Sequence, residues 1–198
     1  MNTRDTLVAV GAMALVVLAS NILVQYPVTG LGDYLTWGAF SYPFAFLVTD
    51  LSNRRFGPAG ARRVVSAGFV LAVALSIVFA TPRIALASGS AFLAAQLLDI
   101  ALFQRLRDRA WWMPPFVSSV VSSALDTVIF FSLAFYCGPV GGTTITGMLG
   151  AVGIADSCQA LPWVSLALAD YAVKLALAVL AIAPYGALLR VTRPAGLR

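Results

Sequence analysis

The sequence contains no histidine and no glutamate, and it has only two cysteines and one lysine. Charged residues make up 11% of its 198 residues, whereas about a quarter of a soluble domain is charged. So few charges cannot cover a globule with polar surface, which excludes an ordinary soluble protein. Without histidine or glutamate, and with so few cysteines, a metal site or a histidine-based catalytic triad is not expected. We therefore predict a protein with no cofactor and no enzymatic activity.

Long apolar runs take the place of the missing charge, since 60% of the residues are hydrophobic. Roughly 20 helical residues bridge the hydrocarbon of a bilayer. Six runs meet this length and predict an all-α membrane protein, with one transmembrane domain over 1–198 and spans at 7–24, 34–53, 61–80, 84–103, 116–137 and 163–189. Polar residues and a proline interrupt the second run. It is counted as a span because the arginines then gather on one side.

The arginines predict how this bundle of six transmembrane helices is oriented. Alternating the spans places eleven arginines on one face and leaves Arg83 on the other, with Lys174 inside a span. Positive charge is retained in the cytoplasm, so both termini are predicted to be cytoplasmic and the protein to be multi-pass in the cell (inner) membrane. The net charge of +5 therefore indicates topology and not nucleic-acid binding. The alternative for the first run, a signal peptide cleaved after Ala19, is disfavoured because the apolar stretch continues to Val24.

The longest predicted loop, 138–162, lies on the outer face and is rich in glycine. Cys137 and Cys158 both lie at this face, which is oxidising in a bacterium. The two residues could form a disulfide that closes the loop, or they could be two buried thiols. The sequence leaves both alternatives open.

Charged residues inside the spans are candidates for function, because a charge at mid-membrane costs about 2.5–3.5 kcal/mol and normally has a partner. Asp126 is near the middle of the fifth span. Ser119, Ser122 and Ser123 precede it by seven, four and three residues, on one helical stripe, which Thr127 widens. Hydroxyl contacts between helices explain the serines, but they do not explain the carboxylate. Asp126 and Ser122 are therefore predicted to contact a substrate.

The sixth span contains Asp170 and Lys174, which are four residues apart and can form an ion pair along one face. Such a pair would only fix the rotation of the helix. Lys174 lies near the midpoint of the span, however, so it could equally neutralise Asp126 or hold an anion.

Two further carboxylates lie in the cytoplasmic halves of the second and fourth spans. Asp50 has Asn53 three residues after it, and Asp99 has Gln96 three residues before it. Each carboxylate therefore has an amide on its own helical face, a combination of donors and acceptors that suits a polar planar ligand.

Both carboxylates also have a purely structural explanation. Asp50 could pair with Arg54 or Arg55 at the end of its helix. Asp99 could have a partner on a neighbouring helix, such as Asn21.

Aromatic residues accompany these polar groups. Tyr42 and Phe46, four apart in the second span, could stack on a ring or pack against lipid. Trp111 and Trp112, at the start of the fifth span, are typical of an interfacial belt.

Several short motifs, in their order along the chain, resemble the VUT family of queuosine-precursor transporters. The match runs from about Asn21 to Tyr185 and includes Tyr42-Pro43, Phe46 to Asp50, Asn53, Gly57, Ala61 to Arg63, Gln96 to Asp99, Phe103, Trp111-Trp112, the serine stripe with Asp126-Thr127, Tyr171 and Lys174. The resemblance implies uptake of 7-cyano-7-deazaguanine or a related small heterocycle, by a carrier or a proton symporter. A guanine-like edge offers N–H donors that a carboxylate accepts bidentately, and a keto oxygen that suits an amide or a lysine.

The predicted substrate-binding residues are accordingly Asp50, Asn53, Gln96, Asp99, Ser122, Asp126 and Lys174. The chain departs from the family pattern at three positions. Arg54 and Phe56 stand where the family usually has Glu and Tyr, and Ser123 stands where it often has Gln. These departures bear on the choice of substrate.

Two other interpretations make different predictions. The first is the substrate-binding subunit of an energy-coupled vitamin importer, which would dock through evenly spaced small residues on the first helix. The alanines of 9–19 do not form such a row. The second is a membrane scaffold that transports nothing, in which replacing the intramembrane acids would harm assembly without a substrate-specific defect. The expected partners of a transporter are a small heterocycle and the lipid bilayer, and the 20.8 kDa chain is of a size that suits a homodimer.

Overall fold

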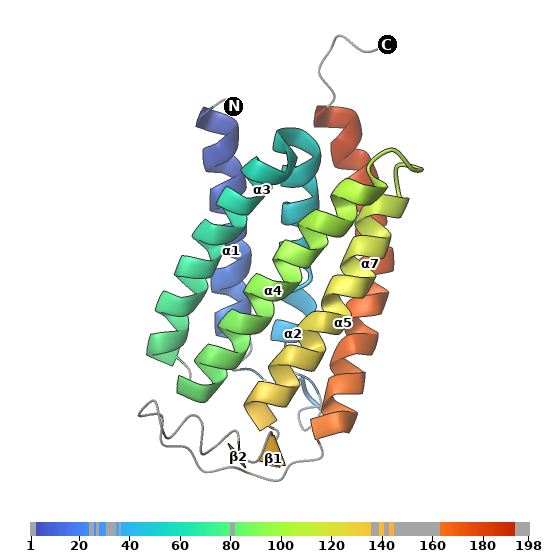
Figure 1. Cartoon of the computed structure of the whole chain (residues 1–198). Helices are drawn as coiled ribbons and strands as arrows, with labels where there is room; N and C mark the ends of the chain where they lie inside the picture. The colour runs from blue at the N-terminus through green and yellow to red at the C-terminus, as the bar shows by residue number, and fades with distance from the viewer. Residues whose placement is uncertain are drawn as a thin grey trace.

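The computed structural model describes residues 3–23, 26, 28–30, 35, 37–79, 82–135, 139–140, 143–144 and 163–192. Its helices are α1 (Thr3–Leu23), α2 (Gly38–Ser41), α3 (Phe44–Phe79), α4 (Pro82–Leu106), α5 (Met113–Phe135) and α7 (Trp163–Thr192). The long helices lie side by side in one bundle (Figure 1). Two short strands, β1 (Pro139–Val140) and β2 (Thr143–Thr144), pair antiparallel between α5 and α7.

The protein is a multi-pass membrane protein whose long elements, in the part of the chain that the structure describes, are all helices. Five helical segments of the described chain are long and apolar enough to cross a bilayer, and one of them, Gly38–Leu75, contains most of both the second and the third predicted spans. Large apolar side chains remain exposed on the outer surface, including Leu15 of α1 and Leu168 and Leu180 of α7. Such a surface is suited to lipid and not to water.

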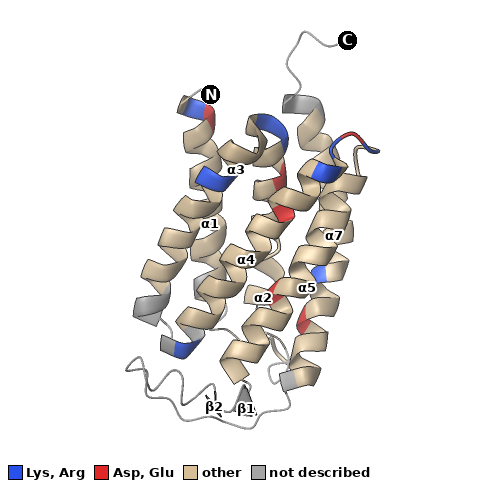
Figure 2. Cartoon of the chain, in the orientation of Figure 1, with Lys and Arg blue, Asp and Glu red and all other residues tan. Residues whose placement is uncertain are grey.

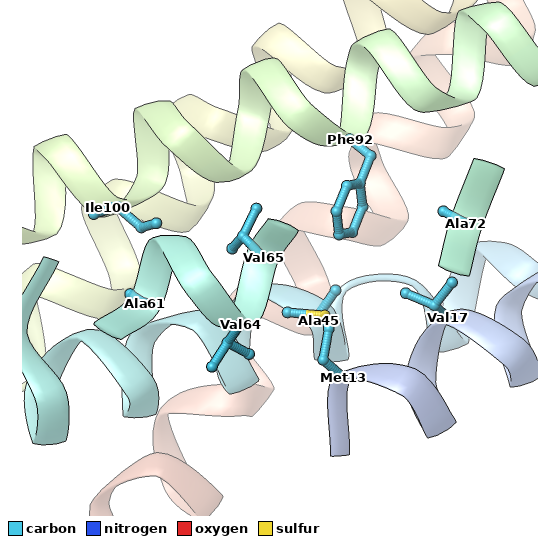
Figure 3. Packing of buried hydrophobic residues seen from close by; sticks show 9 residues of the cluster. All are labelled: Met13, Val17, Ala45, Ala61, Val64, Val65, Ala72, Phe92 and Ile100. Carbon is cyan, nitrogen blue, oxygen red and sulfur yellow. The ribbon is translucent and has the colours of Figure 1, made fainter. Parts of the chain in front are cut away.

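A single residue, Gly57, divides α3 into two arms. Its φ of 73° and ψ of −179° are non-helical and lie in a region that essentially only glycine occupies. Pro58, which follows, is tolerated in the first turn of the next helix because it lacks only an N–H that would be unbonded there. The arms then fold back on each other, so that Ala45 of the first and Val65 of the second belong to one apolar cluster (Figure 3). The segment around 54–60, expected as a loop between two spans, is instead this sharp helical break.

A second interruption separates α2 from the first arm of α3 at Tyr42 and Pro43. Pro43 has no N–H to donate to the carbonyl one turn before it. Backbone hydrogen bonds there reach back three residues instead of four. The Ala45 N–H donates to the Tyr42 carbonyl at 2.9 Å, and the Phe46 N–H donates to the Pro43 carbonyl at 3.1 Å. The second predicted span is therefore a broken helix, and in a membrane such breaks are tolerated where they are buried in protein or line a cavity.

The apolar core packs α1 against both arms of α3 and against α4. Met13 and Val17 from α1 meet Val64, Val65 and Phe92 in this cluster (Figure 3). Gly68 permits the close approach, since a Cβ at that position would lie 2.5 Å from Cγ of Met13.

Most of the arginines that the structure describes lie near the end of the bundle where both termini lie (Figure 2). Here Arg55 of α3 pairs with Asp5 of α1 at 2.7 Å. The guanidinium groups of Arg54 and Arg107 each donate to the other residue's backbone carbonyl, at 3.2 and 3.1 Å. Arg83 lies at the start of α4, at the opposite end, and donates to the Leu133 carbonyl at 2.8 Å. Among the described arginines, those predicted to share one face therefore lie near one end of the bundle, and Arg83 lies at the other.

Cys137 and Cys158 both lie outside the described residues. Their pairing stays a prediction.

Candidate functional site

The interior of the bundle contains charged residues well away from both ends (Figure 2). The Lys174 cluster consists of Lys174 and Asp170 of α7, Asp126 and Thr127 of α5, and Tyr42. The ammonium group of Lys174 lies 2.8 Å from Oδ2 of Asp126 and 2.5 Å from Oδ2 of Asp170. Lys174 and Asp126 are almost fully buried, and Asp170 is mostly so. One cation therefore faces two carboxylates in a low-dielectric environment.

Hydroxyl groups complete this cluster. Tyr42 donates to Oδ1 of Asp126 at 3.1 Å, and Thr127 donates to Oδ2 of Asp170 at 3.0 Å. Asp126 thus has one oxygen on Tyr42 and the other on Lys174. Because Tyr42 sits at the interruption between α2 and α3, the cluster joins three parts of the bundle at a point where the backbone is irregular.

The Asp50–Asp99 cluster lies closer to the arginine-rich end, between the first arm of α3, α4 and α5. Asp50 is 2% exposed and Asp99 is fully buried. Ser118 of α5 donates to Oδ1 of Asp50 at 3.3 Å. Neither carboxyl oxygen of Asp99 has a hydrogen-bond partner among the described residues.

The amides around these carboxylates tie α3 to α4. Thr49 donates to Oε1 of Gln96, and Nδ2 of Asn53 donates to the Ile100 carbonyl at 3.0 Å. These contacts leave several fully buried polar atoms without a hydrogen-bond partner: Oδ1 of Asn53, Nε2 of Gln96, both carboxyl oxygens of Asp99, Oγ of Ser122 and the hydroxyl of Tyr185. Buried polar groups in native proteins are nearly always satisfied, so such a concentration is typical of a place that binds water or a ligand.

The serine stripe of α5 runs between the two clusters. Ser118, Ser119, Ser122 and Ser123 are all buried, as is Asp126 at the end of the stripe. From Ser118 to Asp126 the helix rises about 12 Å. The stripe therefore connects the two clusters along one helix.

A small cavity of about 20 Å³ borders the Lys174 cluster. It is lined by Pro43, Phe46 and Leu47 from α3, by Ser119 and Ser123 from α5, and by Lys174, Leu177, Ala178 and Ala181 from α7. This volume is close to what one water needs, and it is far too small for a bicyclic base. The structure is thus closed around the cluster, and a larger ligand requires α7 to move away from α3 and α5.

The predicted site residues fall into these two clusters. Asp126 and Lys174 meet in one, and both of the ion pairs considered for Lys174 are present. Asp50, Asn53, Gln96 and Asp99 gather in the other, and Ser122 lies on the stripe that connects the clusters.

The structure decides between alternatives that the sequence left open. Asp50 pairs with neither Arg54 nor Arg55, because Arg54 donates to a backbone carbonyl and Arg55 pairs with Asp5. The amides of Asn53 and Gln96 hydrogen-bond to the neighbouring helix. Phe46 is buried against Tyr42 and does not face lipid.

Besides Asp170 and Thr127, other residues in or beside these clusters were not among the predicted contacts. Tyr42 binds Asp126, Ser118 binds Asp50, and Tyr185 of α7 is buried with a free hydroxyl beside the Asp50–Asp99 cluster. Ser118 could have been found from the sequence, since it precedes Asp126 by eight residues on the same helical face. Tyr42 and Tyr185 come from other helices, and their positions depend on tertiary packing.

Comparison with known proteins identifies relatives over most of the chain. Residues 36–81 and 74–188 match the family described as "Putative vitamin uptake transporter". The chain is 36% identical to the "Queuosine precursor transporter" of Escherichia coli (strain K12), over 88% of this chain and 82% of the relative. It is 32% identical to the "Probable queuosine precursor transporter" of Haemophilus influenzae (strain ATCC 51907 / DSM 11121 / KW20 / Rd), over 89% of this chain and 83% of the relative. These relatives are transporters and not enzymes. No solved structure matches the chain.

Proposed function

This chain belongs to the vitamin uptake transporter family, and from that premise we propose that it imports a 7-deazaguanine precursor of queuosine, such as 7-cyano-7-deazaguanine, or a related small heterocycle. The observation that carries the proposal is the Lys174 cluster. It places a buried carboxylate and a buried ammonium group side by side at an interruption of a helix.

The Lys174 cluster is complementary to the edge of a guanine-like ring. Such an edge presents two N–H donors next to a keto acceptor. Asp126 can accept both N–H groups, and Lys174 can donate to the keto oxygen. In the closed structure these two side chains satisfy each other at 2.8 Å. An incoming base would replace that contact with equivalent contacts, which lowers the cost of opening the ion pair.

The proposed transport cycle follows from the closed state. A cavity of about 20 Å³ at the cluster means that the substrate enters only after α7 separates from α3 and α5. Opening at one end and then at the other would carry the base across, by a carrier or a proton symporter mechanism.

The proposed topology is that of one transmembrane domain with six spans. The two arms of α3 count as separate spans, and the arginine-rich end with both termini faces the cytoplasm of the inner membrane. The helical fold, the break at Gly57 and the gathering of arginines at one end support this arrangement. A homodimer remains a prediction from chain length alone.

The test is uptake of labelled 7-cyano-7-deazaguanine by cells that cannot make queuosine, comparing the wild type with Asp126→Asn at equal membrane abundance. Asp126→Asn keeps the size of the side chain but replaces one acceptor oxygen with a donor, so it is expected to reduce uptake at least tenfold. Asp108→Asn, at an exposed position between α4 and α5, is the matched control and should transport normally.

Two results would count against the proposal. If the folded wild type takes up no 7-deazaguanine precursor, the substrate assignment is wrong. If Asp126→Asn transports as well as the control, the Lys174 cluster is structural and the substrate binds elsewhere.

A further inference from the structure

We propose that Asp50 and Asp99 together form the site that binds the transported proton, separate from the substrate contact at the Lys174 cluster. This inference rests on the proposed function and deepens it, because it makes the protein a proton symporter and assigns the two roles to different residues. It starts from a contrast between the two buried acidic clusters. The carboxylates of the Lys174 cluster have a cation, whereas those of Asp50 and Asp99 have none among the described residues.

Burial and proximity dictate how Asp50 and Asp99 are protonated. Both side chains are essentially inaccessible, and residues next to them hydrogen-bond across the interface between α3 and α4, so both carboxyl groups lie at that interface. A buried carboxylate without a cation is costly to ionise, and a second ionised carboxylate nearby adds to that cost. The closed packing of α3 against α4 therefore favours a pair that holds at least one proton.

The other charged and titratable groups around the pair do not neutralise it. Arg54 lies one turn after Asp50 in α3, and its guanidinium donates to the Arg107 carbonyl. Arg107, at the end of α4, donates to the Arg54 carbonyl. Tyr185 approaches from α7, and its hydroxyl has no partner. The side chains that α5 directs at the pair are the uncharged Ser118 and Ser119.

Polar atoms without hydrogen-bond partners surround the proposed proton site and could hydrogen-bond to it or to ordered water. Asp99 has two carboxyl oxygens without a donor, and Gln96, one turn away on α4, has an amide nitrogen without an acceptor. Ser122, one turn beyond Ser118 on α5, has an unpartnered hydroxyl. A chain of hydroxyl groups thus leads from the proton site toward Asp126 over about 12 Å. Water ordered between these groups would connect the two sites by hydrogen bonds.

Coupling follows from the cost of burying ionised carboxylates without a cation. A proton from the outer side forms an O–H bond with one carboxylate, and the first arm of α3 can then close onto α4. At the cytoplasmic side the same O–H bond breaks and the proton passes to water. The ionised groups then favour contact with water, which separates the arm from α4. Proton binding thus favours the closed state. Because Tyr42 precedes the first arm of α3 and donates to Asp126, movement of that arm also displaces a contact of the substrate site.

The experiment uses purified full-length protein in liposomes and labelled 7-cyano-7-deazaguanine as the probe. Exchange of external labelled for internal unlabelled probe, at equal pH on both sides, reports binding and movement across the membrane. Accumulation against a concentration gradient, driven by an acidic exterior, reports coupling to protons. The variants are Asp50→Asn, Asp99→Asn and the exposed control Asp108→Asn. An asparagine is uncharged and cannot release a proton, so it imitates the protonated pair permanently.

The expected result separates the two activities. Wild type and Asp108→Asn exchange the probe and accumulate it at least tenfold, and a protonophore abolishes the accumulation. Asp50→Asn and Asp99→Asn retain exchange within about threefold of wild type but do not accumulate the probe. Asp99→Glu keeps a protonatable carboxyl and should recover part of the accumulation.

The outcomes that overturn the inference differ from those that overturn the function. Exchange by wild type without any response to the pH gradient removes the proton coupling and leaves the transporter. Accumulation by both asparagine variants removes the assignment to these residues. Loss of exchange together with accumulation in folded variants makes the pair a substrate site. Absence of exchange in wild type refutes the proposed function itself.

A measurement on wild type covers the case in which the asparagine variants do not fold. Infrared spectra at neutral pH should contain the carbonyl band of a buried, protonated carboxylic acid that persists in heavy water longer than exposed groups do. If that band is absent at neutral pH, the pair holds no proton and the inference is wrong.

Discussion

Lys174→Met tests how much stability the bundle derives from one buried cation. Lys174 is 5% exposed and contacts Asp126 at 2.8 Å and Asp170 at 2.5 Å. At an effective dielectric constant of about 20, one such contact at 2.8 Å is worth roughly 6 kcal/mol before desolvation is subtracted. Methionine fills a similar volume but leaves two carboxylates without a cation. Breaking a buried pair from one side costs about 3–5 kcal/mol, and we expect a loss of stability of that size.

Thermal unfolding in detergent provides the measurement. For chains of 150–250 residues, about 1 kcal/mol shifts the midpoint by about 2–4 °C, so Lys174→Met should lower it by roughly 6–20 °C. The deficit should be largest at high pH and should shrink as the pH falls, because the two carboxylates left behind become neutral when they bind protons. Asp170→Asn should lower the midpoint much less, since it leaves Lys174 and Asp126 as a balanced pair.

The triple variant Lys174→Met, Asp126→Asn and Asp170→Asn is the decisive control. It removes every charge from the cluster, and its stability should lie above that of Lys174→Met although it carries more substitutions. A triple variant as unstable as the single one, or a Lys174→Met protein as stable as wild type at every pH, would refute the electrostatic reasoning.

Two further substitutions test the breaks in the helices. Gly57→Ala should cost about 1–3 kcal/mol in the same assay, because the backbone at Gly57 occupies a region nearly restricted to glycine. The added Cβ meets no atom within 4 Å, so the cost is one of backbone conformation; Gly11→Ala, also free of contacts but inside α1, is the control and should be neutral or slightly stabilising. Tyr42→Phe removes the hydroxyl that donates to Asp126 at 3.1 Å and should cost about 1.5–3 kcal/mol, less than Lys174→Met; an unchanged midpoint would mean that this hydrogen bond adds nothing to stability.

Much of the architecture could be predicted from composition and charge. Long apolar runs between arginine-rich ends predict a helical bundle in lipid, because a helix satisfies its own backbone hydrogen bonds there. The helices cover the expected runs, with boundaries that shift by a few residues. The breaks were harder to predict. Gly57-Pro58 is a strong signal for a turn, but only the structure shows that Ala45 and Val65, from the two arms, belong to one apolar cluster.

The sequence could predict which polar residues belong to the candidate site, but not which of them pair with each other. Asp126 could be identified as a candidate because a carboxylate in the middle of a membrane helix is energetically costly and normally has a partner or a function. Its partners could not be chosen, since Lys174 is within reach of Asp170 on its own helix and of Asp126 on another, and the sequence does not give the distance between helices. In the structure Lys174 contacts both, and Tyr42 reaches the same carboxylate from 84 residues away.

The break at Gly57 has a consequence for how the chain enters the membrane during synthesis. The first arm of α3 is a poor candidate for insertion alone, since it contains Thr49, Asp50, Ser52 and Asn53 and follows a proline interruption. On insertion scales the aspartate by itself costs about 2.5–3.5 kcal/mol at a helix centre. The second arm is richer in valine and alanine, and a turn of one non-helical residue leaves no linker between the two. The two arms therefore have to partition into the bilayer together, as one helical hairpin, and the polar residues of the first arm are covered when α4 and α5 pack against it.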